Sequence, residues 1–297
     1  MSASKCGLVA LVGRPNVGKS TLVNAIVGEK IAIVSEKPQT TRRAIRGVHQ
    51  SGDAQLVLVD LPGVQRPRDP LTARMARRVQ QELDGADAAL LMLNGEQGVG
   101  PGDRFIAREL AASATPCAIA VNKVDRLSRA ALLSVLAETA GLELDGEVFP
   151  ISARTGAGVG ELIDHLAGML PEGPFMFAAE AASDQPTELL VAELIREAAI
   201  RRTFQEVPHA VEAVVEEIEP GPRPGSPVRV RALIWVETES QKGILIGSGG
   251  AMVKAIGTAA RKEIERALSE RVHLDLSVRV RRDWRADDSL LDRLGIS

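Results

Sequence analysis

Hydrophobic positions in the first 170 residues fall into short aliphatic runs, separated by stretches in which apolar residues recur at helical spacing. The alternation predicts an α/β domain, a mostly parallel sheet with helices on both faces. Ligands of such sheets bind at the carboxyl ends of the strands. The expected strands are 7–13, 54–60, 87–93, 117–122 and 147–152, and the expected helices are 18–28, 70–82, 101–113, 128–140 and 157–170.

The pattern changes after residue 170. Pro171, Gly173 and Pro174 end the last helix, and an Ala-rich stretch to Ser183 has no strong period, so a linker is expected there. The second part predicts a small α+β domain, with a helix at 186–202, strands at 209–218, 228–237 and 272–281, and a helical pair interrupted at 247–250. We therefore divide the chain into a domain at 1–172, a linker at 173–183 and a domain at 184–297.

The composition excludes several classes of protein. An apolar share of 45% with 25% charged residues is typical of a globular chain, and the longest wholly apolar runs are far shorter than the roughly 20 residues that span a bilayer. The net charge of −3 predicts no bulk attraction to nucleic acid or membranes, so any such binding must be local. Cys6 and Cys117 can form at most one disulfide, and no secretory leader precedes them, so we expect a cytoplasmic setting.

Residues 13–20 read GRPNVGKS and fit the phosphate-loop pattern GxxxxGKS, between an expected strand and an expected helix. Its glycines let successive backbone N–H groups point at a phosphate, and the helix N-terminus adds a favourable field. Lys19 is expected to pair with the β- and γ-phosphates and Ser20 to ligate Mg²⁺. The expected nucleotide contacts are Gly13, Arg14, Pro15, Asn16, Val17, Gly18, Lys19, Ser20 and Thr21.

A phosphate loop alone does not distinguish GTP from ATP, but residues 122–125 read NKVD at the end of an expected strand. The Asp125 carboxylate can accept from both N1–H and the exocyclic amine of guanine, and adenine offers no such donor pair. Lys123 is expected to lie over the purine, and Asn122 to connect this loop to the phosphate loop. Ser152, Ala153 and Arg154 follow the next strand, where backbone N–H groups can reach the guanine O6.

Two further segments predict a metal shell and a γ-phosphate sensor. Asp60, Leu61, Pro62 and Gly63 end a strand, where the carboxylate can hold Mg²⁺ and the Gly63 N–H can contact the γ-phosphate. A threonine of the QTTR segment (39–42) can complete the metal shell; we favour Thr41 over Thr40. The expected metal ligands are Ser20, Thr41 and Asp60.

With these elements in order, residues 7–170 resemble a translation-factor-related GTPase domain, and nearly the whole chain resembles the Era family of bacterial GTPases, which join this domain to a KH domain. The resemblance is carried by GRPNVGKS (13–20), QTTR (39–42), DLPGV (60–64), NKVD (122–125), EVPH (206–209), QKGILIGSGG (241–250) and ARKEIE (260–265).

The resemblance implies a smaller α+β domain of the type II KH fold behind the GTPase domain. It implies a switch that binds GTP or GDP with Mg²⁺, hydrolyses GTP, binds the 3′ end of 16S ribosomal RNA and acts in assembly of the 30S subunit. A monomer in the cytoplasm is expected, and such proteins also associate peripherally with the inner membrane.

The expected catalytic residues are Lys19, Thr41, Gly63 and Asn16. Many GTPases carry a glutamine directly after the DxxG glycine to orient the attacking water, but this chain has Val64, which cannot hydrogen bond to water. Asn16 occupies a position that binds K⁺ in related families, where the cation could neutralise developing charge. The alternative is that Asn16 makes only local backbone hydrogen bonds.

The RNA-binding candidate is the turn Gly247, Ser248, Gly249 and Gly250, because a KH GxxG turn clamps the backbone of about four nucleotides. The alternative is a plain glycine-rich helix break, and Ser248 stands where family members often carry a basic residue. Residues 254–285 hold nine basic and five acidic side chains, a net charge of +4. Lys254, Arg261 and Lys262 could therefore edge a phosphate path, although such a run is also typical of a solvated face.

Three further alternatives stay open at this stage. Trp235 could stack on a base or pack in the core. The chain could be a P-loop ATPase or kinase, which the NKVD motif opposes. The C-terminal domain could bind a protein or a membrane rather than RNA.

Overall fold

A computed structural model describes residues 4–37, 39–113, 115–223 and 225–296. It contains two compact units, each treated by itself. The N-terminal unit comprises Met1–Ala32, Thr41–Arg68 and Thr72–Asp184. The C-terminal unit comprises Gln185–Ser297 together with two short segments from earlier in the chain, Ile33–Thr40 and Asp69–Leu71.

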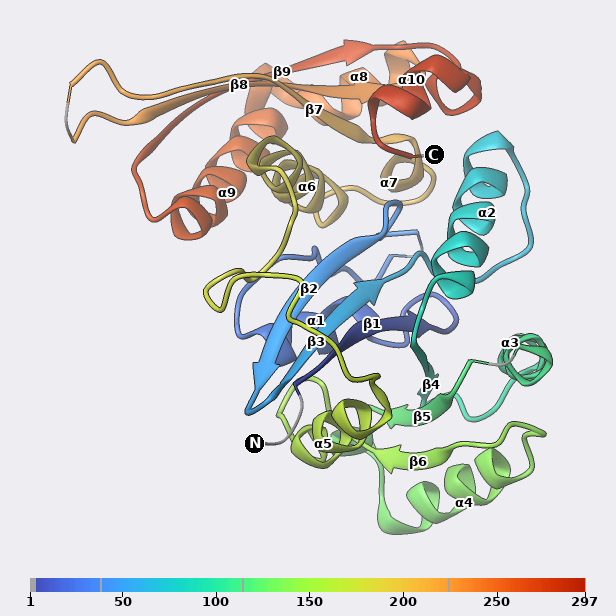
Figure 1. Ribbon diagram of the computed structural model, residues 1–297. Coiled ribbons are helices and arrows are strands. Elements are labelled where there is room, and N and C mark those ends of the chain that lie inside the picture. Colours follow the sequence, from blue (N-terminus) through green and yellow to red (C-terminus); the bar gives the residue numbers. More distant parts are fainter. Residues whose placement is uncertain (1–3, 38, 114, 224, 297) are drawn as a thin grey trace. The chain divides into compact units, whose positions relative to one another are not determined.

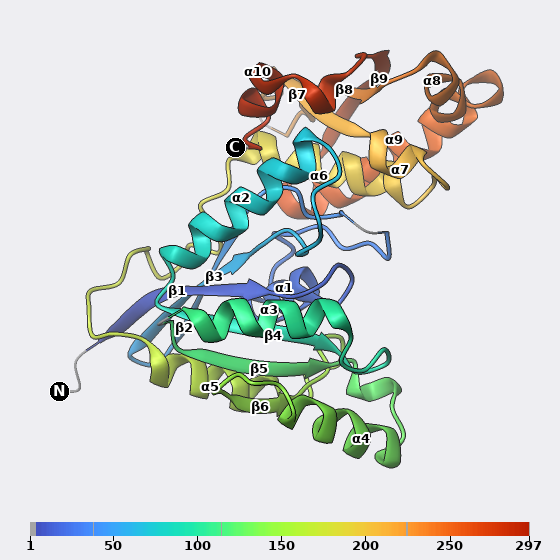
Figure 2. The ribbon, with the colours of Figure 1, turned by 90° about the vertical axis from the view of Figure 1, so that its right-hand side faces the viewer.

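The N-terminal unit is built on a sheet with the strand order β2-β3-β1-β4-β5-β6, parallel except for β2 (Figures 1 and 2). The alternation of strands and helices predicted this sheet but missed β2, whose sequence IRGVHQS is largely polar. It pairs antiparallel with β3. The strands are β1 (Lys5–Val12), β2 (Ile45–Ser51), β3 (Ala54–Asp60), β4 (Ala88–Asn94), β5 (Cys117–Asn122) and β6 (Glu147–Pro150).

Helices cover both faces of this sheet, as the sequence predicts. One core joins α1 (Lys19–Val27) and α5 (Val159–Met169) to the strands. The other joins α2 (Pro70–Asp84), α3 (Pro101–Ala112) and α4 (Arg129–Ala140) to the opposite face. Strands β3, β4 and β5 are buried along their whole length, because they lie inside the sheet between the two helical layers.

The Ala-rich stretch expected to be a linker is held against the sheet of the N-terminal unit. The Gln55 Oε1 accepts hydrogen bonds from the backbone N–H groups of Met176 and Phe177, at 2.9 and 3.0 Å. Further along, the Val48 N–H donates to the Ala182 carbonyl at 2.9 Å. These bonds satisfy backbone groups that would otherwise depend on water.

The C-terminal unit packs helices against one face of a three-stranded sheet, β7-β8-β9, in which β8 pairs antiparallel with β7 and parallel with β9. The predicted order of the larger elements is correct, and three short elements were missed: α7, η3 and α10. The elements are α6 (Thr187–Ile200), α7 (Val207–Ala210), β7 (Glu212–Glu219), β8 (Val228–Val236), α8 (Glu239–Ile246), η2 (Ser248–Gly250), α9 (Ala251–Leu268), β9 (Val272–Val280), η3 (Trp284–Ala286) and α10 (Asp288–Arg293).

Strand β8 alternates between the two faces of this sheet, and the alternation places Trp235. Val230, Ile234 and Val236 are buried in the core, whereas Trp235 is half-buried on the opposite face. The prediction that Trp235 packs in the core is therefore wrong. The buried tryptophan is Trp284, whose indole N–H donates to the Ala210 carbonyl at 3.1 Å.

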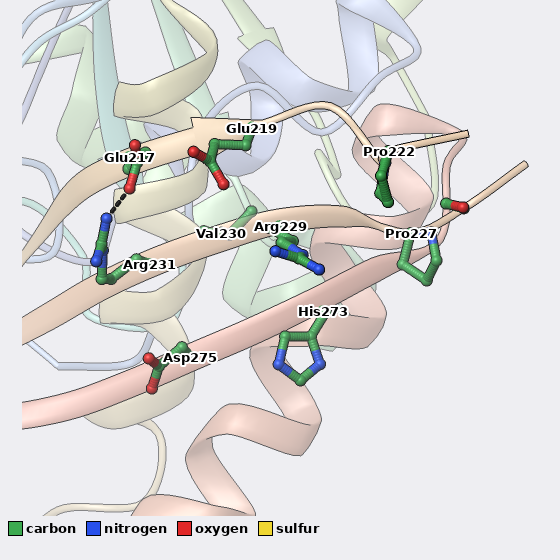
Figure 3. A pocket seen from close by; sticks show the side chains of 10 residues that line it. Glu217, Glu219, Pro222, Pro227, Arg229, Val230, Arg231, His273 and Asp275 are labelled. Atoms are coloured by element: carbon green, nitrogen blue, oxygen red, sulfur yellow. Dashed lines mark ion pairs between the residues drawn. The ribbon is translucent and has the colours of Figure 1, made fainter. Parts of the chain in front are cut away.

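The face of the sheet that carries Trp235, here called the outer face, has both acidic and basic side chains near the β7–β8 connection (Figure 3). Glu217 and Arg231 form an ion pair, and Arg229, His273 and Asp275 lie beside them. Acidic and basic groups are interspersed, so this face offers no uniform potential to a polyanion.

Two expectations about the whole chain can be compared with the described residues. Cys6 and Cys117 are both buried, free thiols, and burial raises the pKa of Cys117 to about 11. No single helix among the described residues has the length and apolar character needed to cross a bilayer. By those two criteria alone, the bent pair Glu239–Ile246 and Ser248–Leu268 passes.

Candidate functional site

The phosphate loop connects β1 to α1 at the carboxyl edge of the sheet. Gly18 caps α1 with φ 105°, a left-handed conformation that favours glycine. A Cβ on Gly18 would lie 2.2 Å from Asn122 Nδ2, and one on Gly13 would lie 2.5 Å from the Met92 carbonyl oxygen. Only glycine fits either position, so tertiary neighbours and backbone conformation fix this loop together.

Lys19 begins α1 and is buried within the loop. Its ammonium donates to the carbonyl oxygens of Gly13 and Arg14, at 3.2 and 3.3 Å. Burial lowers the pKa of Lys19 to about 8, against the opposing attraction of Asp60. A cation held at this depth beside a helix N-terminus is suited to binding a phosphate.

Three oxygen ligands meet beside Lys19. Ser20 Oγ donates to Asp60 Oδ2 at 2.6 Å and lies 3.0 Å from Thr41 Oγ1, which lies 3.3 Å from the same carboxylate oxygen. Thr40 instead donates its hydroxyl to the Lys37 carbonyl, so the geometry favours Thr41. Hydroxyl and carboxylate oxygens are the hard ligands that Mg²⁺ prefers, and the set fits that ion.

The DxxG segment packs directly on the phosphate loop. A Cβ on Gly63 would lie 2.7 Å from the Pro15 nitrogen, so only a glycine permits this approach. The next N–H, that of Val64, donates to the Gly13 carbonyl at 3.0 Å. The Val64 side chain lines a cavity between α2 and α3, and it carries no polar atom that could hydrogen bond to a water molecule.

Asn122 joins three loops at the expected guanine site. Its Nδ2 donates to the Val17 carbonyl at 2.8 Å, which gives the connection to the phosphate loop expected from the sequence. Its Oδ1 accepts from the N–H groups of Lys123 and Ala153, at 2.8 and 2.9 Å. The phosphate, NKVD and Ser152–Arg154 segments are therefore held as one unit.

Asp125 lies at the centre of the expected base-recognition loop. Its Oδ1 accepts from the Ser152 hydroxyl at 2.6 Å, and its Oδ2 accepts from Arg154. These two hydrogen bonds, Ser152 first, lower the pKa of the Asp125 carboxyl. The carboxylate is thus ionised and able to accept from a pair of N–H donors.

Two acidic residues that the motifs did not indicate position this site. Asp103 on α3 is buried and accepts from Arg14 Nε at 2.9 Å, which holds the Arg14 side chain beside the start of α3. Glu96, after β4, lies 3.5 Å from Lys123 Nζ and 3.3 Å from Arg126 Nη1. Each carboxylate lies far from its basic partner in the sequence, so these pairs are seen only in the folded structure.

The second glycine-rich turn lies in the C-terminal unit, between α8 and α9. Thr238 and Gln241 form a capping box at the start of α8, and Gly247 ends that helix. Ser248 and Gly249 are exposed, and Gly249 and Gly250 have φ angles of 57° and 81°. The N–H of Gly250 donates to the Gly247 carbonyl at 3.2 Å, and the exposed Ser248 and Gly249 leave room for a phosphate to approach the backbone before α9.

The three basic candidates on α9 lie on two faces of the helix. Gly257 faces β9, since a Cβ there would lie 3.8 Å from Leu276 Cδ2. Lys254 precedes Gly257 by three residues and Arg261 follows it by four, so both side chains lie next to Gly257 on the helix surface. Lys262 lies one step round, where it lines a groove between α6 and α9 that Lys254 also borders.

Comparisons with known proteins cover both units. Residues 8–123 match the family described as "50S ribosome-binding GTPase", and residues 206–285 match the KH domain. The chain is 43% identical over 299 residues to the GTPase Era of Mycobacterium tuberculosis, covering 99% of this chain and 100% of the relative. The GTPase Era of Mycobacterium avium is also 43% identical, over 298 residues.

Two solved structures are similar over 99% of both chains, each at 36% identity. One is a crystal structure of Era in complex with MgGDPNP and nucleotides 1506–1542 of 16S ribosomal RNA, with a TM-score of 0.94. The other is an Era variant from Aquifex aeolicus bound to GDP and AlF4⁻, with a TM-score of 0.93. The chain has a P-loop GTPase unit and a KH unit, binds guanine nucleotides and hydrolyses GTP; it belongs to the Era family of GTPases.

Proposed function

We propose that this GTPase binds the 3′ end of 16S ribosomal RNA through its KH unit and acts in assembly of the 30S subunit. The observation that carries the proposal is the similarity over 99% of both chains to an Era bound to nucleotides 1506–1542 of that RNA. The exposed GSGG turn supplies the local geometry, because its glycines allow close approach of a phosphate backbone.

The test is binding of RNA 1506–1542 to the full-length protein, with GTP, with GDP and with a nonhydrolysable GTP analogue. We expect binding that weakens at higher salt, because phosphate contacts release counterions. The same samples are floated with vesicles of anionic lipid. Vesicle binding without RNA binding would overturn the proposal in favour of membrane docking. For a chain that serves the small subunit, we propose a cytoplasmic monomer.

For hydrolysis, we propose that Lys19 stabilises the transferring phosphate and that the Gly63 N–H contacts it. Ser20, Thr41 and Asp60 would hold Mg²⁺, which neutralises charge on the phosphate oxygens when bound. Asp125 would select guanine. Val64 cannot orient the attacking water, so another group must contribute to the rate of hydrolysis.

We propose K⁺ beside Asn16 as that contribution. Asn16 lies in the phosphate loop with φ 63°, a left-handed conformation uncommon outside glycine. A cation there would offset negative charge as an arginine finger does. GTP hydrolysis should be faster in KCl than in NaCl at equal ionic strength, and Asn16→Ala should remove the difference. Equal rates of the parent protein in the two salts would dismiss the cation.

A further inference from the structure

A second candidate site in the C-terminal unit is a groove between α6 and α9, which lie side by side in Figure 1. Its volume is about 910 Å³. Small side chains form much of its lining, among them Ala198, Ala255 and Ala259. Arg201 and Arg202 come from the α6 side, and Lys254 and Lys262 come from α9. Cations thus border the groove on both of its long sides.

The acidic residues of the groove do not neutralise these cations fully. Glu197 accepts from Arg201 at 2.9 Å, and Glu263 accepts from Arg266, outside the groove lining, at 2.7 Å. Within the described part of the chain, Lys254 and Lys262 form no ion pair. The groove therefore has excess positive charge, in contrast to the mixed outer face of the sheet in Figure 3.

The groove continues from the GSGG turn. Ala251, the first residue of α9, follows Gly250 directly and lines the groove. Lys254 and Lys262 are eight residues apart on the same helix, about 12 Å along its axis. At about 3.4 Å per phosphate along the axis of a stacked strand, that length spans about four successive phosphates. A strand clamped at the turn could thus extend along α9 without leaving positively charged surface.

We propose that the α6–α9 groove binds the phosphate backbone of the RNA segment adjoining the one clamped by the GSGG turn. The inference rests on the proposed RNA-binding function and adds Arg202 to the expected contacts. Recognition is by charge and not by base identity, because the groove offers ammonium and guanidinium groups and its walls carry no aromatic side chain among the lining residues.

The test compares Arg202→Gln/Lys262→Gln with a matched control, Arg223→Gln/Arg293→Gln, which removes two exposed cations elsewhere in the C-terminal unit. Each protein is titrated with RNA 1506–1542 and with hexamers tiling that sequence, at several salt concentrations. A hexamer is long enough to fill the turn, which clamps about four nucleotides.

For the groove variant we expect affinity for RNA 1506–1542 to fall about tenfold. The slope of log K against log salt should flatten by about 1.4, the value for two lost phosphate contacts on a single strand. Hexamer affinity should be unchanged, which also shows that the unit is folded. If the groove variant bound RNA 1506–1542 with the affinity and salt slope of the parent protein, the proposal for the groove would be wrong. The proposal for the GSGG turn would be unaffected. If the parent protein bound neither RNA, the proposed function itself would fall.

Discussion

The two glycine-rich turns of this chain both precede a helix, yet their surroundings are opposite. In the phosphate loop, a Cβ on Gly13 or Gly18 would overlap protein atoms at 2.5 or 2.2 Å. In the GSGG turn, a Cβ on Gly249 or Gly250 would meet nothing within 4 Å. The first turn is enclosed by its own protein, whereas the second is open toward solvent at Gly249 and Gly250 and packs on Met252 only at Gly247.

The difference shows what each set of glycines contributes. In the enclosed loop, glycine allows Asn122 and the Met92 carbonyl to pack against the backbone, which builds a fixed site for a small ligand. In the open turn, glycine supplies left-handed backbone and leaves room for a partner from outside. A fixed site favours selectivity between nucleotides, whereas an open turn favours backbone contact with a polymer.

The largest effect is expected at the enclosed site, from Asp125→Asn. Two charge-assisted hydrogen bonds to guanine contribute about 1.5 to 3 kcal/mol each, so GTP affinity should fall about 1,000-fold. Xanthosine triphosphate should bind better than GTP, because its C2 carbonyl accepts from an amide. Competition titrations with both nucleotides measure the change. GTP affinity equal to that of the parent would show that Asp125 does not contact the base.

The next effect, about 100-fold on GTP affinity, is expected from Gly18→Ala. The added methyl displaces Asn122 and requires a left-handed alanine, which costs roughly 1 to 2 kcal/mol by itself. Gly28→Ala is the matched control, because Gly28 ends the same helix with φ 84° and has open space around it. The control should lose stability in a melting curve and keep its GTP affinity. If both variants lost the same GTP affinity, the loss at Gly18 would come from its left-handed backbone and not from the contact with Asn122.

The sequence predicted most of the enclosed site because its parts are contiguous motifs. GRPNVGKS and NKVD each follow an aliphatic strand, and the parallel order of the strands places them at one edge. The supporting carboxylates of Asp103 and Glu96 were not predictable in this way. Their partners, Arg14 and Lys123, are separated from them by 89 and 27 residues, and no local pattern encodes such a pairing.

The open turn was predicted as a motif, but its surroundings were not. Helical periodicity gave α9 and its charges, whereas the groove depends on α6, which lies more than 50 residues earlier in the sequence. Arg202 was missed for this reason. Strand β2 was missed because edge strands need not be apolar, and the short helices α7 and α10 lack a readable period.

A smaller effect, on RNA rather than on nucleotide, is expected from Ser248→Asp/Gly249→Asp. Two carboxylates in the exposed turn would repel the phosphate backbone, and affinity for RNA 1506–1542 should fall about 30-fold. Gly225→Asp/Ser226→Asp is the matched control, because it places the same charges at another solvent-facing glycine with φ 80°. Filter binding at two salt concentrations and a melting curve make the comparison. If the turn variant is folded and binds RNA as well as the parent protein, the result would favour the alternative that the C-terminal unit binds a protein or a membrane.

The smallest effect, about fivefold on RNA affinity, is expected from Gly249→Ala. Nothing in the protein opposes the methyl group, so any loss comes from the left-handed conformation at φ 57° and from a phosphate held further from the backbone. Gly225→Ala shares the left-handed cost at φ 80° and lies on the β7–β8 connection, so it should lower the melting temperature by a similar amount without affecting RNA. If the two alanine variants melt alike and only Gly249→Ala loses affinity, the glycine of the open turn serves its partner. If neither variant loses RNA affinity, Gly249 is needed only for the backbone conformation of the turn. The two glycine-rich turns would then differ in how tightly the protein packs around them, and not in how they bind their ligands.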